Sequence, residues 1–233
     1  MNENLGNKYF IIFNKDEIIF NCLNGKNKIS FAKKYNLKDK NLNNLYSELE
    51  NFLSDNLIQI EKKLDNYIQK IYFIVNTNDT LSASLSISYN LKTETATPNK
   101  IGDLLKDLKY QFTKYNDDYK IIHMTISKSL VNKENISIFA KDMISKNFIL
   151  EVKFECLKKQ IVNVIQKSLS KYQISVEKFF VLDYLQELNQ NYSENILCTA
   201  NKVINGQIDN EVLLITKKLA KNSFFERFFS YFK

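Results

Sequence analysis

The stretch FILEVKFECLKKQIVNVIQKSLSKYQISVEKFFVLDYL, residues 148–185, changes its hydrophobic period twice. Apolar and charged residues first alternate over 150–156, which is typical of a β-strand with one buried face. Apolar residues then recur at steps of three and four over 158–172, the pattern of an amphipathic α-helix. An apolar run over 176–182 predicts a second strand. The stretch therefore predicts a strand–helix–strand unit.

Three further elements are predicted immediately before this unit. The apolar run at 119–126 predicts a strand. Thr97 and Pro98 form an N-cap followed by proline at the first helical position, and the apolar stripe that follows predicts a helix ending near Tyr115. The segment LSASLSISY, residues 81–89, places five apolar side chains on one face and four serines on the other. This alternation predicts a strand with one wet face.

The first 78 residues predict a small meander followed by a helix and a strand. Three strands are expected at 9–13, 17–23 and 29–33, joined by short polar turns. Apolar residues at helical spacing over 41–69 predict one long or two shorter amphipathic helices, and a buried strand follows at 71–75. No linker rich in Pro, Gly or Ser interrupts the chain. The fold class is therefore predicted to be α+β, with mixed and antiparallel sheets and packed helices.

The sequence offers no constellation for catalysis. His123 is the only histidine, so neither a histidine-dependent triad nor a multi-histidine metal site can form, and its neighbours in IIHMTI indicate a structural position in a strand. The four glycines are scattered, so no loop offers successive backbone amides to a nucleotide phosphate. The carboxylate pairs Asp117–Asp118 and Glu151–Glu155 are predicted to face solvent. We expect a protein that is not an enzyme, with no catalytic residue, metal or cofactor.

Composition and charge narrow the functional class of the protein further. The three cysteines, Cys22, Cys156 and Cys198, have no CxxC pairing and are expected to be reduced thiols of a cytoplasmic protein. The net charge of +7 is spread along the chain without aromatic interleaving, so a nucleic-acid partner is not predicted. No apolar window is long enough to span a bilayer, and no secretion signal is recognisable.

KIIHMTISKSLVN, residues 120–132, together with residues 148–185, resembles the subdomain inserted into the bacterial actin-like cell-division protein FtsA. In that family a strand carrying a leucine–histidine step precedes a variable loop, a charged alternating strand, a helix and a further strand. The resemblance implies a partial actin-like first lobe at 1–78 and the inserted strand-helix-strand-strand module at 79–182. The module would be followed by a closing helix and strand at 183–216 and by a tail at 217–233.

Two departures from the family qualify what the resemblance implies. Actin-like ATPases grip phosphate with an Asp-x-Gly loop between the first two strands, whereas Asn14-Lys15-Asp16 stands at that place here. Nothing after Asp183 resembles the second lobe, which would carry the adenosine pocket and the docking site for the FtsZ tail. We therefore expect neither nucleotide binding nor the usual FtsZ contact.

The segment NSFFERFFSYFK, residues 222–233, is predicted to form an amphipathic helix that lies in a membrane interface. Ser223 and Glu226 form a capping box, and at ~100° per residue the aromatic side chains fall within an arc of about 160°. Nearby cations add attraction to an anionic leaflet. The alternative is a helix docked on the protein's own core. The predicted membrane-binding residues are Lys217, Lys218, Lys221, Phe224, Phe225, Arg227, Phe228, Phe229, Tyr231, Phe232 and Lys233.

These observations together predict a non-catalytic adaptor on the inner face of the cytoplasmic membrane. By resemblance to FtsA, it would link division proteins to the anionic lipid surface, or self-associate, through the inserted module. The alternative is a soluble protein-binding module or homodimer of a pilus or other envelope assembly system, whose phenylalanine-rich tail packs on its own core.

Overall fold

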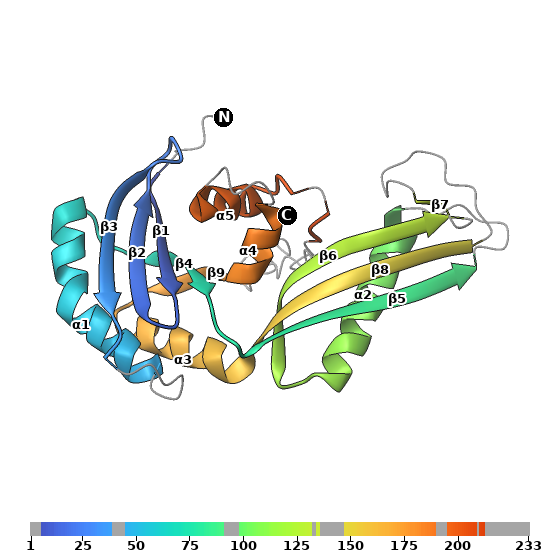
Figure 1. Cartoon of the computed structure of the whole chain (residues 1–233), viewed down its shortest axis with the longest axis horizontal. Helices are drawn as coiled ribbons and strands as arrows, with labels where there is room; N and C mark the ends of the chain where they lie inside the picture. Colours follow the sequence, from blue (N-terminus) through green and yellow to red (C-terminus); the bar gives the residue numbers. More distant parts are fainter. Residues whose placement is uncertain are drawn as a thin grey trace, which may run out of the picture.

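The computed structural model describes residues 6–38, 45–90, 98–131, 134–135, 147–189, 195–208 and 210–212. They form two β-sheets with helices packed against each, which confirms the predicted α+β class (Figure 1). The elements follow one another in the order that the resemblance implies. Three opening strands, a helix and a strand come before the second sheet. The helix Lys159–Ser170 and the strand Ser175–Val181, which the resemblance included in the module at 79–182, instead pack with the first sheet, so the module of the structure ends at Lys158. The fold is thus a lobe built on one sheet, with a module built on a second sheet inserted into it.

The first sheet is mixed and has the strand order β3-β2-β1-β4-β9. Strands β1, β2 and β3 form an antiparallel meander, and β4 and β9 run parallel to β1 and to each other. Strand β1 is almost continuously apolar and buried, as expected for a strand covered on both faces. The bounds are β1 Lys8–Phe13, β2 Glu17–Leu23, β3 Ile29–Asn36, β4 Lys70–Val75 and β9 Ser175–Val181.

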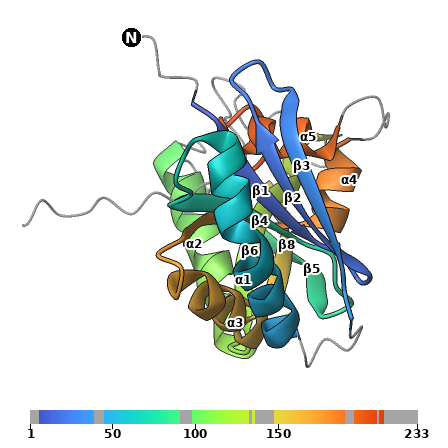
Figure 2. The same cartoon turned by 90° about the vertical axis from the view of Figure 1, so that its left-hand side faces the viewer.

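Helices cover both faces of this sheet. Helices α1 and α3 pack together on one side, and α4 and α5 pack together on the other (Figures 1 and 2). Helix α1 is a single helix that ends before Asp65, whose φ of 48° lies in the left-handed region. The bounds are α1 Leu45–Leu64, α3 Lys159–Ser170, α4 Leu182–Leu188 and α5 Ile196–Ile204.

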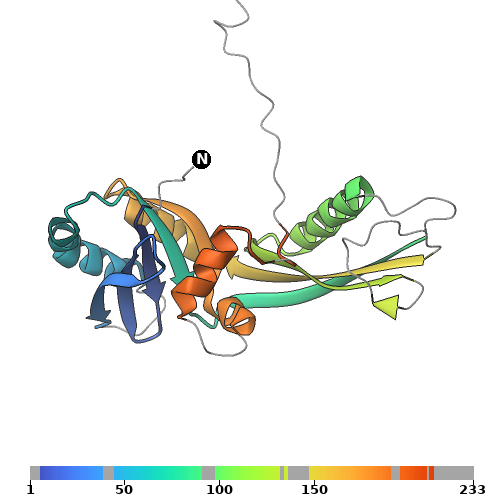
Figure 3. The same cartoon turned by 90° about the horizontal axis from the view of Figure 1, so that it is seen from above.

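The inserted module is an antiparallel sheet with one helix on one face. The strand order is β5-β8-β6-β7, and the module joins the lobe between β4 and α3. Helix α2 packs through Phe112, whose ring stacks on Phe154 of β8 at 4.6 Å between centroids. Figure 3 shows the two sheets side by side along the molecule. The bounds are β5 Thr80–Asn90, α2 Pro98–Tyr115, β6 Tyr119–Val131, β7 Glu134–Asn135 and β8 Asn147–Lys158.

Burial confirms most of the predicted faces and corrects one. His123 is buried within β6, and Cys22 and Cys156 are buried thiols, as predicted; burial raises the pKa of Cys156 to about 12. Glu155 was expected in solvent, but it is 5% exposed. It accepts a 2.8 Å hydrogen bond from Ser82 and pairs with Lys153 at 2.9 Å. The prediction was wrong because alternation identifies the face of a strand but not what later packs on that face.

Candidate functional site

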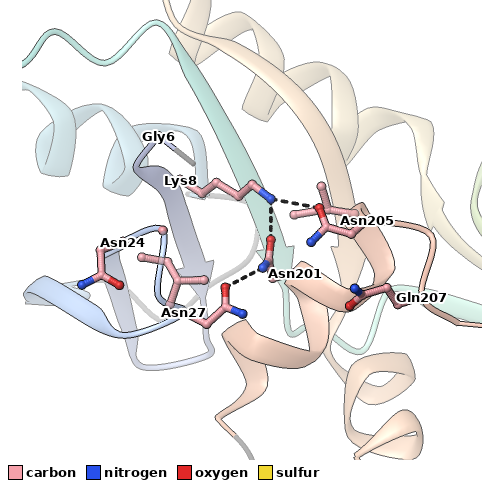
Figure 4. Close-up of a pocket in the computed structure, with 10 residues that line it drawn as sticks. Gly6, Lys8, Asn24, Asn27, Asn201, Asn205 and Gln207 are labelled. Atoms are coloured by element: carbon pink, nitrogen blue, oxygen red, sulfur yellow. Dashed lines mark hydrogen bonds between the residues drawn. The ribbon is translucent and has the colours of Figure 1, made fainter. Parts of the chain in front are cut away.

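A polar cavity opens in the lobe where β1 begins, where β2 turns into β3 and where α5 ends. We call it the Lys8 pocket; its volume is about 530 Å³ (Figure 4). Its polar lining consists of Lys8, Asn24, Asn27, Asn201, Asn205 and Gln207. Leu23 and Ile204 supply its apolar wall. The pocket therefore joins segments from the two ends of the described chain.

The backbone on each side of the pocket is fixed by local hydrogen bonds. The Asn24 side chain accepts bonds of 3.0 Å from the backbone N–H groups of Lys26 and Lys28, which closes the β2–β3 turn. Asn27 then adopts a φ of 58°, a left-handed conformation that asparagine tolerates. Across the pocket Gly206 has a φ of 66° just past the end of α5, so the chain leaves the helix toward Gln207. The backbone on both rims of the pocket thus adopts defined turns.

A chain of polar contacts crosses the floor of the pocket. The Lys8 ammonium donates to the side-chain oxygen of Asn201 and, at 3.2 Å, to that of Asn205. The Asn201 amide donates in turn to the Asn27 side-chain oxygen at 2.6 Å. Asn201 is only 6% exposed, so these partners fix which way its amide points (Figure 4). The floor therefore presents a cation held between neutral amides.

The described lining of the Lys8 pocket consists mainly of amide side chains. Among the residues that the structure describes, its lining includes one lysine and several amides, but no histidine, cysteine, hydroxyl or carboxylate. The described side chains can donate and accept hydrogen bonds. Within the described part of the chain, no cluster of His, Cys, Asp or Glu is arranged to hold a metal ion.

Lys8 also borders a second, shallower hollow of about 320 Å³ at the starts of β1, β4 and β9. Three tyrosines, Tyr9, Tyr67 and Tyr72, line it, and Tyr67 is 81% exposed. On its rim Lys70 pairs with Glu177 at 2.9 Å. Lys8 is the one described residue that lines both hollows.

A second polar cluster joins the module to the lobe; we call it the joint, made of His123, Lys178, Tyr184 and Glu211. Glu211 lies beside β6 because residues 210–212 pair with that strand through the Thr125–Glu211 bridge. Its carboxylate accepts from His123 Nδ1 and from Lys178, both at 3.0 Å. The ring of Tyr184 from α4 stacks on His123 at 3.9 Å between centroids. Side chains of β6, β9 and α4 thus meet around one carboxylate.

The contacts of His123 define its neutral tautomer. The Val181 N–H approaches Nε2 at 3.4 Å and requires an acceptor there, so the proton lies on Nδ1 and is donated to Glu211. Burial lowers the pKa of His123, and the Glu211 carboxylate only partly opposes that shift. Burial would raise the pKa of Glu211, but the bond from His123 and the charge of Lys178 outweigh it and lower that pKa.

We expect the free energy of unfolding to fall as pH drops from 7 to 5. Unfolded histidine has a pKa of about 6.5, so below that value the unfolded state binds a proton that folded His123 resists. The stability is fully present above about pH 6.5 and declines below it. Urea denaturation at several pH values measures this slope, and His123→Asn should flatten it between pH 5 and 7. An unchanged slope in the variant would assign the acid sensitivity to other groups.

Strand β5 forms an edge of the module sheet among the described residues. It pairs only with β8, across all eleven of its residues from Thr80 to Asn90. Its serines are exposed and its apolar side chains half-buried, as the alternation predicts. No charged residue and no proline occurs in TLSASLSISYN, although natural edge strands are commonly protected by such residues. The backbone groups on the outer side of β5 are therefore a template for another strand.

The predicted membrane-binding residues, Lys217 to Lys233, lie outside the described residues, so that prediction remains as the sequence made it. None of the described helices has the length and apolar character that crossing a membrane requires. The structure adds the Lys8 pocket, which sequence reasoning missed. Its residues are common types in this chain, and Lys8 and Asn201 stand 193 positions apart. No local pattern links them.

No family model and no curated protein sequence matches the chain. Among solved structures it is similar to the PilM–PilN type IV pilus biogenesis complex, with 6% identity, a TM-score of 0.48, and coverage of 76% of this chain and 48% of that chain. A second is the cytoplasmic domain of EpsL, an inner membrane component of the type II secretion system of Vibrio cholerae. There the identity is 10%, the TM-score 0.41, and the coverage 77% and 58%.

A third similar structure is a Bacteroides thetaiotaomicron protein with an actin-like ATPase fold and unknown function. The identity is 11%, the TM-score 0.36, and the coverage 80% of this chain and 57% of that chain. The chain thus spans about half the length of the first of these proteins and less than two thirds of the other two. At these identities, and with all three TM-scores below 0.5, the likeness assigns neither a family nor a residue's role to this chain.

Proposed function

We propose that the protein is a non-catalytic adaptor that assembles with a second copy of itself through the inserted module. The observation that carries the proposal is the edge strand β5, which is long, uncharged and unpaired on its outer side among the described residues. A strand with these properties readily pairs with another strand. We therefore propose that a second strand covers the exposed edge of β5 in the cell.

The sequence of β5 fits an identical strand. In antiparallel pairing about a two-fold axis at Leu85, apolar residues oppose apolar residues and serines oppose serines. Ser84 of one copy faces Ser86 of the other, and Ala83 faces Ile87. No charge is brought against a like charge, and the half-buried apolar face gains cover from the partner. The two modules would then share one continuous sheet.

We expect the pair of changes Ser84→Glu and Ser86→Glu to weaken self-association about tenfold. The two-fold axis places the carboxylate introduced at position 84 of each copy against the one introduced at position 86 of the other. Two such like-charge contacts cost roughly 0.5–1 kcal/mol each, and together they should raise the dissociation constant about tenfold. Both serines are exposed, so the monomer should fold normally. Sedimentation equilibrium over a range of protein concentrations measures the dissociation constant.

The matched control differs by one residue. In the variant Ser84→Glu with Ser86→Lys, each glutamate faces a lysine of the other copy, so pairing should return to within about threefold of the wild type. Within one chain these positions lie beside Lys153 and Glu151 of β8, which suits the introduced charges. If both variants associate as the wild type does, or if the wild type is monomeric at all concentrations, self-assembly through β5 is wrong.

The proposal also includes attachment to the inner face of the cytoplasmic membrane through residues 217–233. Support comes from the sequence, where the phenylalanines of 222–233 separate from the charged residues at helical spacing. By resemblance to FtsA, the setting would be the septal ring, with division proteins as further partners. A pilus or other envelope assembly is the alternative setting, and a homodimer whose tail packs on its own core is the alternative architecture.

Within this proposal the protein acts by binding and not by catalysis. The one histidine is enclosed under Tyr184 and committed to Glu211, so it is not available to a substrate. The turn between β1 and β2 contains Asn14, Lys15 and Asp16 and no glycine, which leaves it without the Asp-x-Gly phosphate loop that the resemblance would require. We accordingly propose that no nucleotide is used.

A further inference from the structure

We infer that the side of the molecule formed by helices α1, α3 and α2 lies against an anionic membrane surface. The inference deepens the proposed membrane attachment and rests on it, because it names the surface that the attached protein turns toward the lipid. Helices α1, α3 and α2 lie along one side of the two sheets, and α4 and α5 lie on the other (Figures 2 and 3). We call the first side the helical side; both the lobe and the module contribute to it.

Exposed apolar side chains mark the helical side. Ile58 on α1 is 63% exposed, and Tyr110 on α2 is 64% exposed. Tyr110 follows the buried Ile101 by nine residues, which at ~100° per residue places it opposite the stripe of α2 that packs on the sheet. Both side chains therefore face outward, where aliphatic and tyrosine side chains can enter the interface of a bilayer.

The exposed charges of the same helices suit an anionic surface. Lysines are exposed on all three helices, and in the described part of the chain they are Lys62, Lys63, Lys106, Lys109, Lys114, Lys159 and Lys167. The exposed carboxylates of these helices are fewer, namely Asp55, Asp103 and Asp107. Lysines close to a membrane surface are attracted to its anionic lipids. The helical side therefore fits a lipid surface better than a basic or a purely apolar partner.

The path of the chain leads to the same side of the module. Val212 packs against the apolar cluster that α2 covers. The predicted membrane helix begins at Ser223, and the ten residues between them can span at most about 35 Å. A helix is roughly 10–12 Å across, so the outer surface of α2 lies well within that reach. One bilayer can therefore hold the tail and contact the helical side.

Self-assembly through β5 would strengthen this contact. The two-fold axis of an antiparallel strand pair at Leu85 is perpendicular to the shared sheet, so the α2 helices of both copies lie on the same face of that sheet. Two copies of the helical side can then face one bilayer together, and binding becomes bivalent.

Tryptophan fluorescence tests the contact directly, because the chain contains no tryptophan of its own. The reporters are Ile58→Trp and Tyr110→Trp, and the matched control is Gln186→Trp on α4; all three positions are exposed. The probe is vesicles of phosphatidylglycerol and phosphatidylcholine in equal parts, with and without brominated lipid. On these vesicles we expect both reporters to emit at shorter wavelength and to be quenched by the brominated lipid. Gln186→Trp should keep the spectrum that it has in solution.

A pair of charge reversals tests the electrostatic part. Lys109→Glu together with Lys167→Glu should weaken binding to the same vesicles about tenfold, because two cations that attract the anionic surface become carboxylates that it repels. Lys26→Glu together with Lys28→Glu is the matched control. It changes the net charge equally, but on the exposed β2–β3 turn beside α5, and it should weaken binding by about threefold at most.

Vesicle binding of the wild type separates the helical side from the proposed attachment. If the wild type does not bind vesicles, the attachment is wrong and the helical side falls with it. If the wild type binds while Ile58→Trp and Tyr110→Trp keep their solution spectra, or while Gln186→Trp shifts equally, the attachment stands and the helical side is not the contact. Emission that changes with protein concentration and not with vesicles would also overturn the inference and identify a protein interface.

Discussion

Phe228→Glu is expected to release the protein from anionic liposomes almost completely in a flotation assay. A helix over 223–233 would place Phe228 near the middle of the apolar arc, at ~100° per residue. Burying a carboxylate there costs several kcal/mol, comparable with the membrane affinity that one short helix provides. Raising the salt concentration should weaken binding of the wild type only in part, because it screens the cations of 217–233 but not the phenylalanines.

Ser230→Glu is the matched control, since it adds the same charge on the opposite side of the arc. It should reduce flotation only slightly. Melting temperatures distinguish the membrane anchor from a helix docked on the protein's own core. A Phe228→Glu protein that melts much earlier than the wild type yet still floats would refute the anchor. One that melts normally and remains in solution would support it.

The spacing of apolar residues predicted the strands and helices well where the signal lies within a single element. LSASLSISY alternates without interruption, and both the strand β5 and the faces of its side chains were predicted correctly. Pro98 begins α2 and Tyr115 ends it, as the N-cap Thr97 and the apolar stripe predicted. In both cases the signal lies within the element itself.

Element ends were predicted less well where a contact outside the element decides them. The helical pattern over 41–69 includes Ile68, which is buried, yet α1 ends at Leu64. The Glu61 carboxylate accepts the Ile68 N–H at 2.8 Å, so the chain turns and Ile68 enters the core from a loop. Helical spacing of an apolar residue thus indicates that the residue is buried, but it does not show that the residue belongs to the helix. The same limit explains Glu155, which is buried and accepts a hydrogen bond from Ser82 on another strand.

The Lys8 pocket and the joint could not be predicted, because neither has a local signature. Asn27 and Asn201 are 174 positions apart and meet only once α5 packs beside the β2–β3 turn. His123 was correctly predicted to be structural from its apolar neighbours, but its partner Glu211 is 88 positions away. Contacts of this kind depend on which elements become neighbours, and that is decided by the packing of the whole chain.

Glu211→Gln is expected to destabilise the protein by about 2–3 kcal/mol. The change keeps the shape of the side chain, but it removes the charge that holds both the His123 N–H and the Lys178 ammonium at 3.0 Å. Removing one partner of a fully buried pair costs roughly 3–5 kcal/mol, and the value is lower here because Lys178 is partly exposed and regains some water. For a chain of this size the melting temperature should fall by about 5–10 °C.

Glu177→Gln is the matched control, because the Lys70–Glu177 pair has a similar distance of 2.9 Å but lies in solvent. That variant should have the same melting temperature as the wild type, because an exposed ion pair contributes little to stability. Glu211 also holds residues 210–212 against β6, so hydrogen exchange at the amides of Ile126 and Val212 should quicken in Glu211→Gln and not in Glu177→Gln. Equal melting temperatures for the two variants would mean that the Glu211 contacts do not help to hold the module to the lobe. A loss confined to Glu211→Gln, with faster exchange at the joint, would identify this carboxylate as a polar contact that fastens the module to the lobe, beside the more exposed pair of Lys153 with Glu187.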